Sequence, residues 1–271
     1  MASIQSLSSA VLNTAKTKSL YINWLHVLTF LCASLSIFTS GTWLYVLAIV
    51  ALISQLMSWL ISITLKRKKS LGQELLRLNI LQKSFGTEFA IDIAYLKSKV
   101  SKQEFQKAKE FETPNYYATE DENHEKRLID ILQESCFWSQ HLYQSCQNSS
   151  IKASIILGVF IIIIVVTGLT IIETDTNYTI PRLSVLFLMF FPLWNLIENA
   201  ISYGLANRKL TAIDQQLSNI NYDTPSILSI FAEYNVVTSN TPLIPQRIYE
   251  NEQEKLNELW CERSANKSSN N

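Results

Sequence analysis

The sequence predicts an all-α membrane protein in which four transmembrane helices form two hairpins and further helices form a cytoplasmic domain. Of its 271 residues, 48% are hydrophobic and only 17% are charged, and the apolar residues are gathered into a few long runs. Runs of about 20 apolar residues are typical of membrane spans and not of one globular core. The polar stretches between them repeat apolar residues at helical spacing, which predicts helices outside the bilayer as well.

The first transmembrane hairpin is expected at residues 20–65, after a cytoplasmic N-terminus at 1–19. One span runs from about Leu20 to Phe38 and the next from about Trp43 to Leu65, and TSGT at 39–42 connects them. At 1.5 Å per residue, about 20 residues cross roughly 30 Å of hydrocarbon. Each segment is therefore long enough to form one span.

The second transmembrane hairpin is expected at residues 153–205. Its spans run from about Ala153 to Ile172 and from about Leu183 to Leu205. The β-branched residues of IILGVFIIIIVV do not oppose a helix there, because only a helix satisfies the backbone polar groups of a single segment in lipid. The remaining regions are a helical sensor or coupling region at 66–152 and a helical tail at 206–271.

Basic residues flank one end of every expected span. Positive charge stays on the cytoplasmic side of a membrane, so both termini and the region 66–152 are expected to be cytoplasmic. The opposite ends carry only Arg182. The flanking residues are Lys16, Lys18, Lys66, Arg67, Lys68, Lys69, Lys152, Arg208 and Lys209.

Three helical segments are expected outside the bilayer. Apolar residues recur at helical spacing over 70–112, where Gly86 is a point of interruption and Pro114 ends the segment. Thr119 and Glu122 form a capping-box pattern at the start of a second helix. The second helix has an apolar stripe, and a third helix follows TPLIP near the C-terminus. The stripe of the second helix consists of Leu128, Ile131, Leu132, Ser135, Trp138 and Leu142. The apolar residues of the third helix that recur at helical spacing are Ile248, Tyr249, Leu256, Leu259 and Trp260.

Four polar residues of the fourth span share one helix face and are candidates for pore lining or gating. Asn195, Glu198, Asn199 and Ser202 follow one another at spacings of three and four. A carboxylate inside a span costs about 2–3 kcal/mol on insertion scales, so it should face protein or water. This face either lines a pore or an interface that opens on activation, or it holds the bundle together by interhelical hydrogen bonds.

Two further gating candidates lie in the first hairpin. Gln55 shares a face of the second span with Ser58 and Ser62, and His26 lies in the first third of the first span. His26 is a candidate pH sensor. For both residues we favour the alternative that they are structural and hydrogen-bonded within the bundle.

The sensor or coupling candidates lie between the two hairpins. The two tyrosines can stack on bases, and the lysine and the arginine can bind phosphate, as nucleotide ligands require. A glutamate and a tryptophan of the same predicted helix are the other two candidates. The alternative is that the tyrosines anchor a turn and the charges form a solvated face. The candidates are Tyr116, Tyr117, Lys126, Arg127, Glu134 and Trp138.

Several stretches resemble the SMODS-associated four-transmembrane effectors of bacterial cyclic-oligonucleotide antiphage (CBASS) systems. They are PNYYAT at 114–119, RLIDILQESCFWSQHLY at 127–143 and TPLIPQRIYENEQEKLNELW at 241–260. The resemblance implies that a cognate nucleotidyltransferase, triggered by phage, makes a cyclic di- or trinucleotide that activates the protein. The activated protein would then form pores in, or disrupt, the bacterial inner membrane and stop growth before phage matures.

The sequence favours a recognition function over catalysis. It contains no Walker loop, GxGxxG, GxSxG or HExxH motif, and its histidines and four scattered cysteines show no metal-ligand spacing, so we expect no enzyme, cofactor or metal site. With 23 basic and 23 acidic residues, duplex nucleic acid is not an expected partner. Four spans leave little room for an internal channel, so a pore requires a homo-oligomer in the lipid bilayer. The alternative function is a constitutive membrane scaffold or small transporter component whose cytoplasmic helices dock a protein partner.

Overall fold

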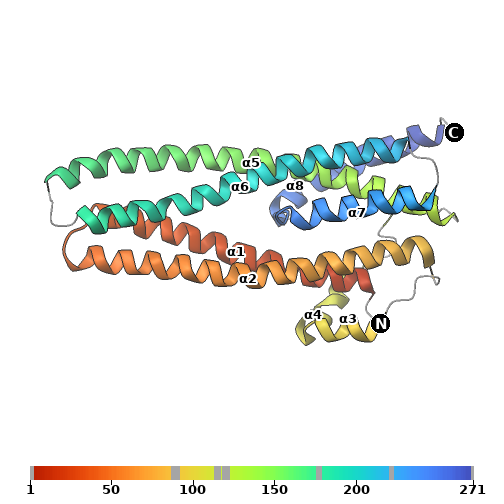
Figure 1. The fold of residues 1–271 in the computed structure, drawn as a ribbon, viewed down its shortest axis with the longest axis horizontal. Coiled ribbons are helices and arrows are strands. Elements are labelled where there is room, and N and C mark those ends of the chain that lie inside the picture. Colours follow the sequence, from red (N-terminus) through yellow and green to blue (C-terminus); the bar gives the residue numbers. More distant parts are fainter. Residues whose placement is uncertain are drawn as a thin grey trace. The chain divides into compact units, whose positions relative to one another are not determined.

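A computed structural model describes residues 3–86, 92–112, 117, 123–174, 179–219 and 223–269, and every regular element in these ranges is a helix (Figure 1). The elements are α1 Ile4–Ile37, α2 Thr42–Phe85, α3 Ile93–Lys99, α4 Lys102–Lys107, the 3₁₀-helix η2 Ala108–Phe111, α5 His124–Thr174, α6 Thr179–Ser218, α7 Thr224–Asn240 and α8 Gln246–Ser269. Four of them, α1, α2, α5 and α6, are long and apolar enough to cross a membrane. The predicted all-α fold with four such helices is confirmed.

Three local predictions meet different outcomes. The helix expected over 70–112 is interrupted: α2 ends at Phe85, and Gly86 adopts the left-handed conformation, with φ of +60°, that commonly ends a helix. The expected capping residues Thr119 and Glu122, and Pro114, lie outside the described residues. The described part of α5 is preceded by Asn123, whose Oδ1 accepts a hydrogen bond from the amide of Lys126 at 2.9 Å.

The chain divides into two compact units. We call Met1–Lys16, Arg67–Cys146 and Ser202–Asn271 the polar unit, and Thr17–Lys66 and Gln147–Ile201 the apolar unit. Helices α1, α2, α5 and α6 each contribute residues to both units.

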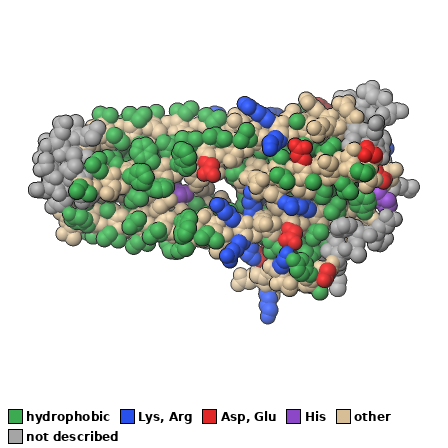
Figure 2. Space-filling view, viewed as in Figure 1, with side chains coloured by type: hydrophobic (Ala, Val, Ile, Leu, Met, Phe, Trp, Pro, Cys, Tyr) green, Lys and Arg blue, Asp and Glu red, His purple; other side chains and the backbone are tan. Residues whose placement is uncertain are grey.

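The apolar unit has a narrow core of small and medium side chains. Ala33, Ile37, Ala51 and Met189 are fully buried in it. Many of its large apolar side chains are exposed, and Figure 2 shows hydrophobic side chains spread over the visible surface of this unit. Gly41, with φ of +66°, lies in the turn between α1 and α2, where TSGT was expected to turn the chain.

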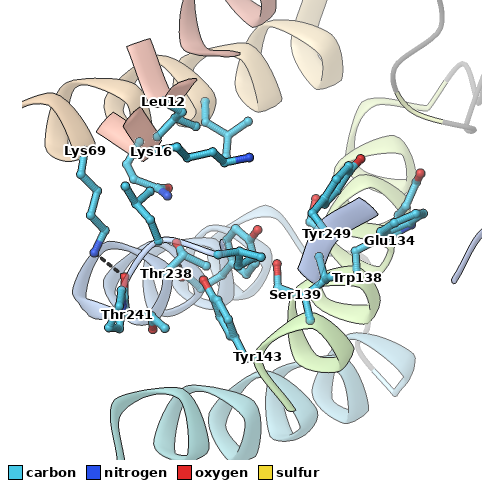
Figure 3. A pocket seen from close by; sticks show the side chains of 18 of the residues that line it. Leu12, Lys16, Lys69, Glu134, Trp138, Ser139, Tyr143, Thr238, Thr241 and Tyr249 are labelled. Carbon is cyan, nitrogen blue, oxygen red and sulfur yellow. Dashed lines mark hydrogen bonds between the residues drawn. The ribbon is translucent and has the colours of Figure 1, made fainter. Parts of the chain in front are cut away.

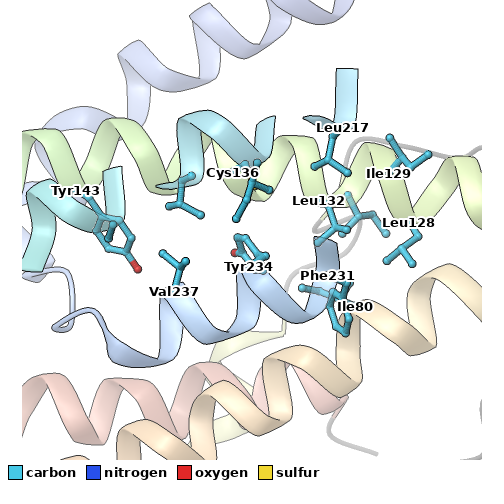
Figure 4. Packing of buried hydrophobic residues seen from close by; sticks show 14 of the residues in the cluster. Ile80, Leu128, Ile129, Leu132, Cys136, Tyr143, Leu217, Phe231, Tyr234 and Val237 are labelled. Atoms are coloured by element: carbon cyan, nitrogen blue, oxygen red, sulfur yellow. The ribbon is translucent and has the colours of Figure 1, made fainter. Parts of the chain in front are cut away.

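The polar unit has the larger core, and one face of helix α7 packs into it (Figure 4). Phe231 and Tyr234 of α7 pack with Leu132 and Cys136 of α5 and with Leu210 of α6. This helix was not predicted as a separate element. Its start has a clear local cause: the side chain of Asp223 accepts from the amide of Ser226 at 3.1 Å, and proline occupies the first turn.

A smaller cluster of the polar unit joins the first helix to the short helices α3 and α4. Leu7 and Val11 of α1 pack with Leu75 of α2 and Leu96 of α3. The hydroxyl of Ser8 donates to the Gly72 carbonyl at 2.9 Å, and α1 lies so near that a Cβ on Gly72 would come within 2.6 Å of the Leu12 side chain. Residues 3–16 therefore belong to the folded core of the polar unit.

Candidate functional site

The polar unit contains a partly open cavity of about 580 Å³ lined by residues of α1, α2, α5, α7 and α8, by the segment between α7 and α8, and by Tyr117 (Figure 3). Its volume falls within the range of small-molecule sites, about 300–1,000 Å³. Its lining combines two lysines, one carboxylate, five aromatic rings and several amides and hydroxyls. These residues are Lys16, Lys69, Glu134, Tyr117, Trp138, Tyr143, Tyr234, Tyr249, Gln73, Gln253, Asn257, Ser135, Ser139, Thr238 and Thr241.

Lys16 reaches into the cavity from α1. Its ammonium donates a hydrogen bond to Oε1 of Gln246 at 2.7 Å and lies 5.6 Å from the centre of the Tyr249 ring. Burial lowers the pKa of Lys16 from its ordinary value, and the nearby Glu250 carboxylate opposes that shift. The hydrogen bond to Gln246 is with a neutral group, so an anion entering the cavity would be a stronger partner.

Lys69 enters from α2 and holds the C-terminal end of α7. Its ammonium donates to the backbone carbonyls of Ser239 and Thr241, the first at 2.7 Å. Arg77, two turns further along α2, donates to the carbonyl of Asn235 at 3.4 Å and to the Ser239 hydroxyl. The last carbonyls of a helix lack intrahelical partners and carry partial negative charge, which explains why the Lys69 ammonium lies at this end of α7.

Aromatic rings form the wall supplied by α5 and α8. The rings of Trp138 and Tyr249 are stacked, with centres 6.2 Å apart and planes inclined by 29°. Burial raises the pKa of Tyr143, so its hydroxyl stays neutral and able to donate a hydrogen bond. Figure 3 shows Glu134 on the same side as Trp138 and Tyr249, and Lys69 on the opposite side. Lys69 therefore lies across the cavity from Trp138 and Tyr249, whereas the Lys16 ammonium lies close to the Tyr249 ring.

The predicted sensor residues are only partly brought together by this cavity. Tyr117, Glu134 and Trp138 belong to its lining. Lys126 and Arg127 lie outside the lining, and Arg127 donates to the Lys83 carbonyl at 3.3 Å. Tyr116 lies outside the described residues.

Three of the cavity's most informative residues were not predicted as site residues. Lys16 and Lys69 were interpreted only as charges that orient the spans, and Tyr249 only as part of an apolar stripe. The lysines occur in basic clusters next to apolar runs, a pattern that membrane orientation fully explains. No local signal in the sequence distinguishes a lysine that points into a cavity from one at the membrane surface.

A second polar cluster lies within the apolar unit and joins residues from three helices. Nδ2 of Asn199 donates to Oδ1 of Asn195 at 3.3 Å, which turns Nδ2 of Asn195 towards Nε2 of His26 at 3.2 Å. Because an amide nitrogen donates, His26 accepts at Nε2 and is neutral. The side chain of Gln55 lies beside the imidazole.

This cluster gathers four of the six gating candidates. Within the described part of the chain, Nδ1 of His26 and Oε1 of Gln55 are buried and have no hydrogen-bond partner in this arrangement. Glu198 is exposed on the surface of the apolar unit, and Ser202 is half-buried in the polar unit. The shared face of α6 is thus divided among three environments.

No protein-family model, curated protein or solved structure matches this chain. Among the residues that the structure describes, no group of three or more His, Cys, Asp and Glu side chains is placed to hold a metal ion. In the described part of the chain, the cavity of the polar unit and the polar cluster of the apolar unit are the features from which we argue a function.

Proposed function

We propose that this protein is a ligand-gated membrane effector that permeabilises the bacterial inner membrane in antiphage defence. Its polar unit binds a cyclic di- or trinucleotide made by a cognate nucleotidyltransferase, and its apolar unit, assembled with further copies, forms or opens a pore. One observation carries the proposal: a cavity lined by two lysines and five aromatic residues lies in a unit built partly from the four helices that can span a membrane.

The cavity lining supports a nucleotide ligand. Lys16 and Lys69 supply cations for phosphate oxygens, and charge-assisted hydrogen bonds of this kind are about twice as strong as neutral ones. Trp138 and Tyr249 offer ring faces for stacking, which is worth about 1–3 kcal/mol per base in single-stranded nucleic acid complexes. Glu134 lies on the same side as Trp138 and Tyr249, where its carboxylate can accept from an amino group of a base.

The proposed topology is two transmembrane hairpins at 20–65 and 153–205, with both termini, 66–152 and 206–271 in the cytoplasm. The outward-facing side chains of the apolar unit support it. Trp194 is 68% exposed and Phe187 is 65% exposed, a degree expected of lipid-facing residues in spans and unusual for a water-soluble surface. The basic flanks of the spans give the orientation.

The pore is proposed to form between copies and not within one chain. The core of the apolar unit is filled by its own side chains, among them the fully buried Ile37 and Met189. Glu198 is exposed on this unit, and at this depth a carboxylate facing hydrocarbon costs about 2–3 kcal/mol on insertion scales. A homo-oligomer in which Glu198 faces water or a neighbouring copy avoids that cost.

The test is release of a dye from liposomes that contain the purified full-length protein. Cyclic di- and trinucleotides are added one at a time, and the linear dinucleotides serve as controls. We expect release with one cyclic species alone. No release with any of them, from folded protein in the correct orientation, would contradict the proposal and favour a scaffold that docks a protein partner through its cytoplasmic helices.

A second measurement examines the pore itself. If Glu198 lines the conduction path, Glu198→Gln should reduce the preference for cations in planar-bilayer recordings, because a ring of carboxylates selects cations. The control is Trp194→Leu on the same helix, which should leave selectivity unchanged. Equal selectivity of wild type and Glu198→Gln, together with a lower folded yield, would place Glu198 in packing and not in the pore.

A further inference from the structure

We infer that Lys69 is an anion-operated latch: an oxyanion of the ligand takes the Lys69 ammonium from the backbone carbonyls of Ser239 and Thr241 and so releases the C-terminal end of α7. This inference rests on the proposed function, because it assigns a regulatory role to the same cavity. It adds a direction of change that the cavity alone does not give, namely that binding loosens one helix end.

The position of Lys69 makes it both a latch and a ligand contact. Its ammonium bonds the last carbonyls of α7 while its side chain forms part of the cavity wall (Figure 3). Thr238 and Thr241, at the end of α7, also line the cavity. A ligand that fills the cavity therefore lies against both partners of the latch.

Charge favours the exchange. The carbonyl oxygens of Ser239 and Thr241 are neutral acceptors, whereas a phosphate oxygen carries a formal charge and forms a stronger hydrogen bond with an ammonium. Glu134 is the carboxylate of the lining and lies on the side away from Lys69, so it repels an anion towards Lys69. Lys16 supplies the second cation, held at present by the neutral amide of Gln246.

Loss of Lys69 from α7 would leave Arg77 as the remaining cation with a hydrogen bond to this helix end among the described residues. Arg77 holds Asn235 and Ser239 from the same helix α2 but lies outside the cavity lining. The Val237 carbonyl in the final turn of α7 also accepts from the Thr241 amide at 3.2 Å and from the Thr241 hydroxyl at 2.7 Å, and the Tyr203 hydroxyl donates to the Leu243 carbonyl just beyond the helix at 2.7 Å. Without Lys69, this last turn should fray, and the amides of residues 235–243 should exchange faster with solvent.

These roles separate into three variants of the full-length protein in detergent. Lys16→Met removes a ligand contact but no contact to α7, Arg77→Met removes a contact to α7 but none to the ligand, and Lys69→Met removes both. The probe is inorganic pyrophosphate, which supplies anionic oxygens without a base. Its affinity is measured by calorimetry, and amide hydrogen exchange of residues 235–243 is followed by mass spectrometry, with thermal unfolding as the check that each variant is folded.

In the wild type, we expect pyrophosphate to increase exchange of residues 235–243 by several-fold. Lys16→Met should bind pyrophosphate about tenfold more weakly with normal exchange in the free protein, since one charge-assisted hydrogen bond is lost. Arg77→Met should show faster exchange with affinity unchanged or higher. Lys69→Met should combine weaker binding with fast exchange that pyrophosphate no longer alters.

Three results would overturn the inference. Exchange that slows or stays constant when pyrophosphate binds to the wild type excludes release of α7. If Lys69→Met binds pyrophosphate more weakly but its amide exchange is normal, Lys69 is a ligand contact only. If Lys69→Met exchanges faster but binds pyrophosphate with normal affinity, Lys69 is a structural cap only. None of these readouts requires membrane leakage, so the two proposals can fail separately. The expected changes in amide exchange without any dye release from liposomes would contradict the proposed function alone. Dye release driven by a cyclic nucleotide, without a change in amide exchange, would contradict the latch alone.

Discussion

The polar and apolar units differ in how far their largest side chains are buried. In the polar unit, large residues such as Ile131, Leu210 and Tyr234 are almost fully buried. In the apolar unit, Trp24 and Trp194 are 65% and 68% exposed. The same long helices supply residues to both units, so the difference does not come from the type of secondary structure.

This difference follows from the solvent, which determines whether burying a large apolar side chain stabilises a helix. In water, burying a large apolar side chain stabilises the fold by about 1.5–3 kcal/mol, so such residues gather inside. In lipid, no such gain exists, and helices associate through close packing of small residues and through interhelical hydrogen bonds. The apolar unit shows both, with Ala33 and Ala51 in its core and the hydrogen bond between His26 and Asn195.

The largest difference between the units should appear when an isoleucine is truncated in each. Ile131→Ala, at a position only 1% exposed in the polar unit, should lower the free energy of unfolding by about 2–5 kcal/mol because it leaves a cavity. Ile162→Ala, at a position 64% exposed in the apolar unit, should change it by less than about 1 kcal/mol. Denaturant unfolding in detergent measures both, and equal effects would contradict the distinction between the units.

A smaller effect should follow when the intramembrane hydrogen bonds are removed. Asn195→Leu breaks the contacts with His26 and Asn199 and should lower stability by about 1 kcal/mol, the size typical of interhelical hydrogen bonds in membranes. Trp194→Leu, its exposed neighbour, is the matched control and should be nearly neutral in thermal unfolding. A control variant that destabilises as much as Asn195→Leu would show that packing, and not hydrogen bonding, holds this site.

In the polar unit, one buried carboxylate should make stability depend on pH. Burial raises the pKa of Glu104, but Lys68 at 2.7 Å and the Ser101 side chain and amide lower it, and the net shift is down from the ordinary value of 4.5. The folded pKa is therefore below the unfolded one, so the stabilisation is present above pH 4.5 and is lost as the pH falls through the folded pKa.

Glu104→Gln should accordingly flatten the loss of thermal stability below pH 4.5. The matched control is Glu74→Gln, which breaks the exposed ion pair with Lys99 and should have little effect on the pH profile. A profile of Glu104→Gln identical to that of the wild type would show that the ion pair with Lys68 and the capping box that Glu104 forms with Ser101 at the start of α4 contribute nothing to acid stability.

The smallest expected effect is a difference in the chemical reactivity of the cysteines, which leaves stability unchanged. Cys261 is exposed, whereas Cys136 and Cys146 are buried in the polar unit, and burial raises the pKa of Cys146 to about 12. The thiolate is the reactive form, so a maleimide at pH near 8 should label Cys261 and spare the other two. Mass spectrometry identifies the modified residue, and rapid labelling of Cys146 in folded protein would show that this core opens.

Part of the candidate site could be predicted from the sequence. Tyr117, Glu134 and Trp138 were identified as sensor candidates because they lie in or beside one polar, aromatic helical segment, and all three line the cavity. Lys16 and Tyr249 were missed because they lie more than two hundred positions apart in the sequence. A contact between such residues leaves no periodic pattern in either segment.

The sequence by itself determined the helical class and the four long apolar helices. Both follow from local properties: hydropathy summed over about 20 residues, and the need of a helix to satisfy its own backbone polar groups in lipid. Only the tertiary structure decided that residues 3–16 join the core of the polar unit, that α7 is clamped by Lys69 and Arg77, and that His26 meets Asn195. These are contacts between distant segments, and they depend on how complete helices pack and not on the composition of any one of them.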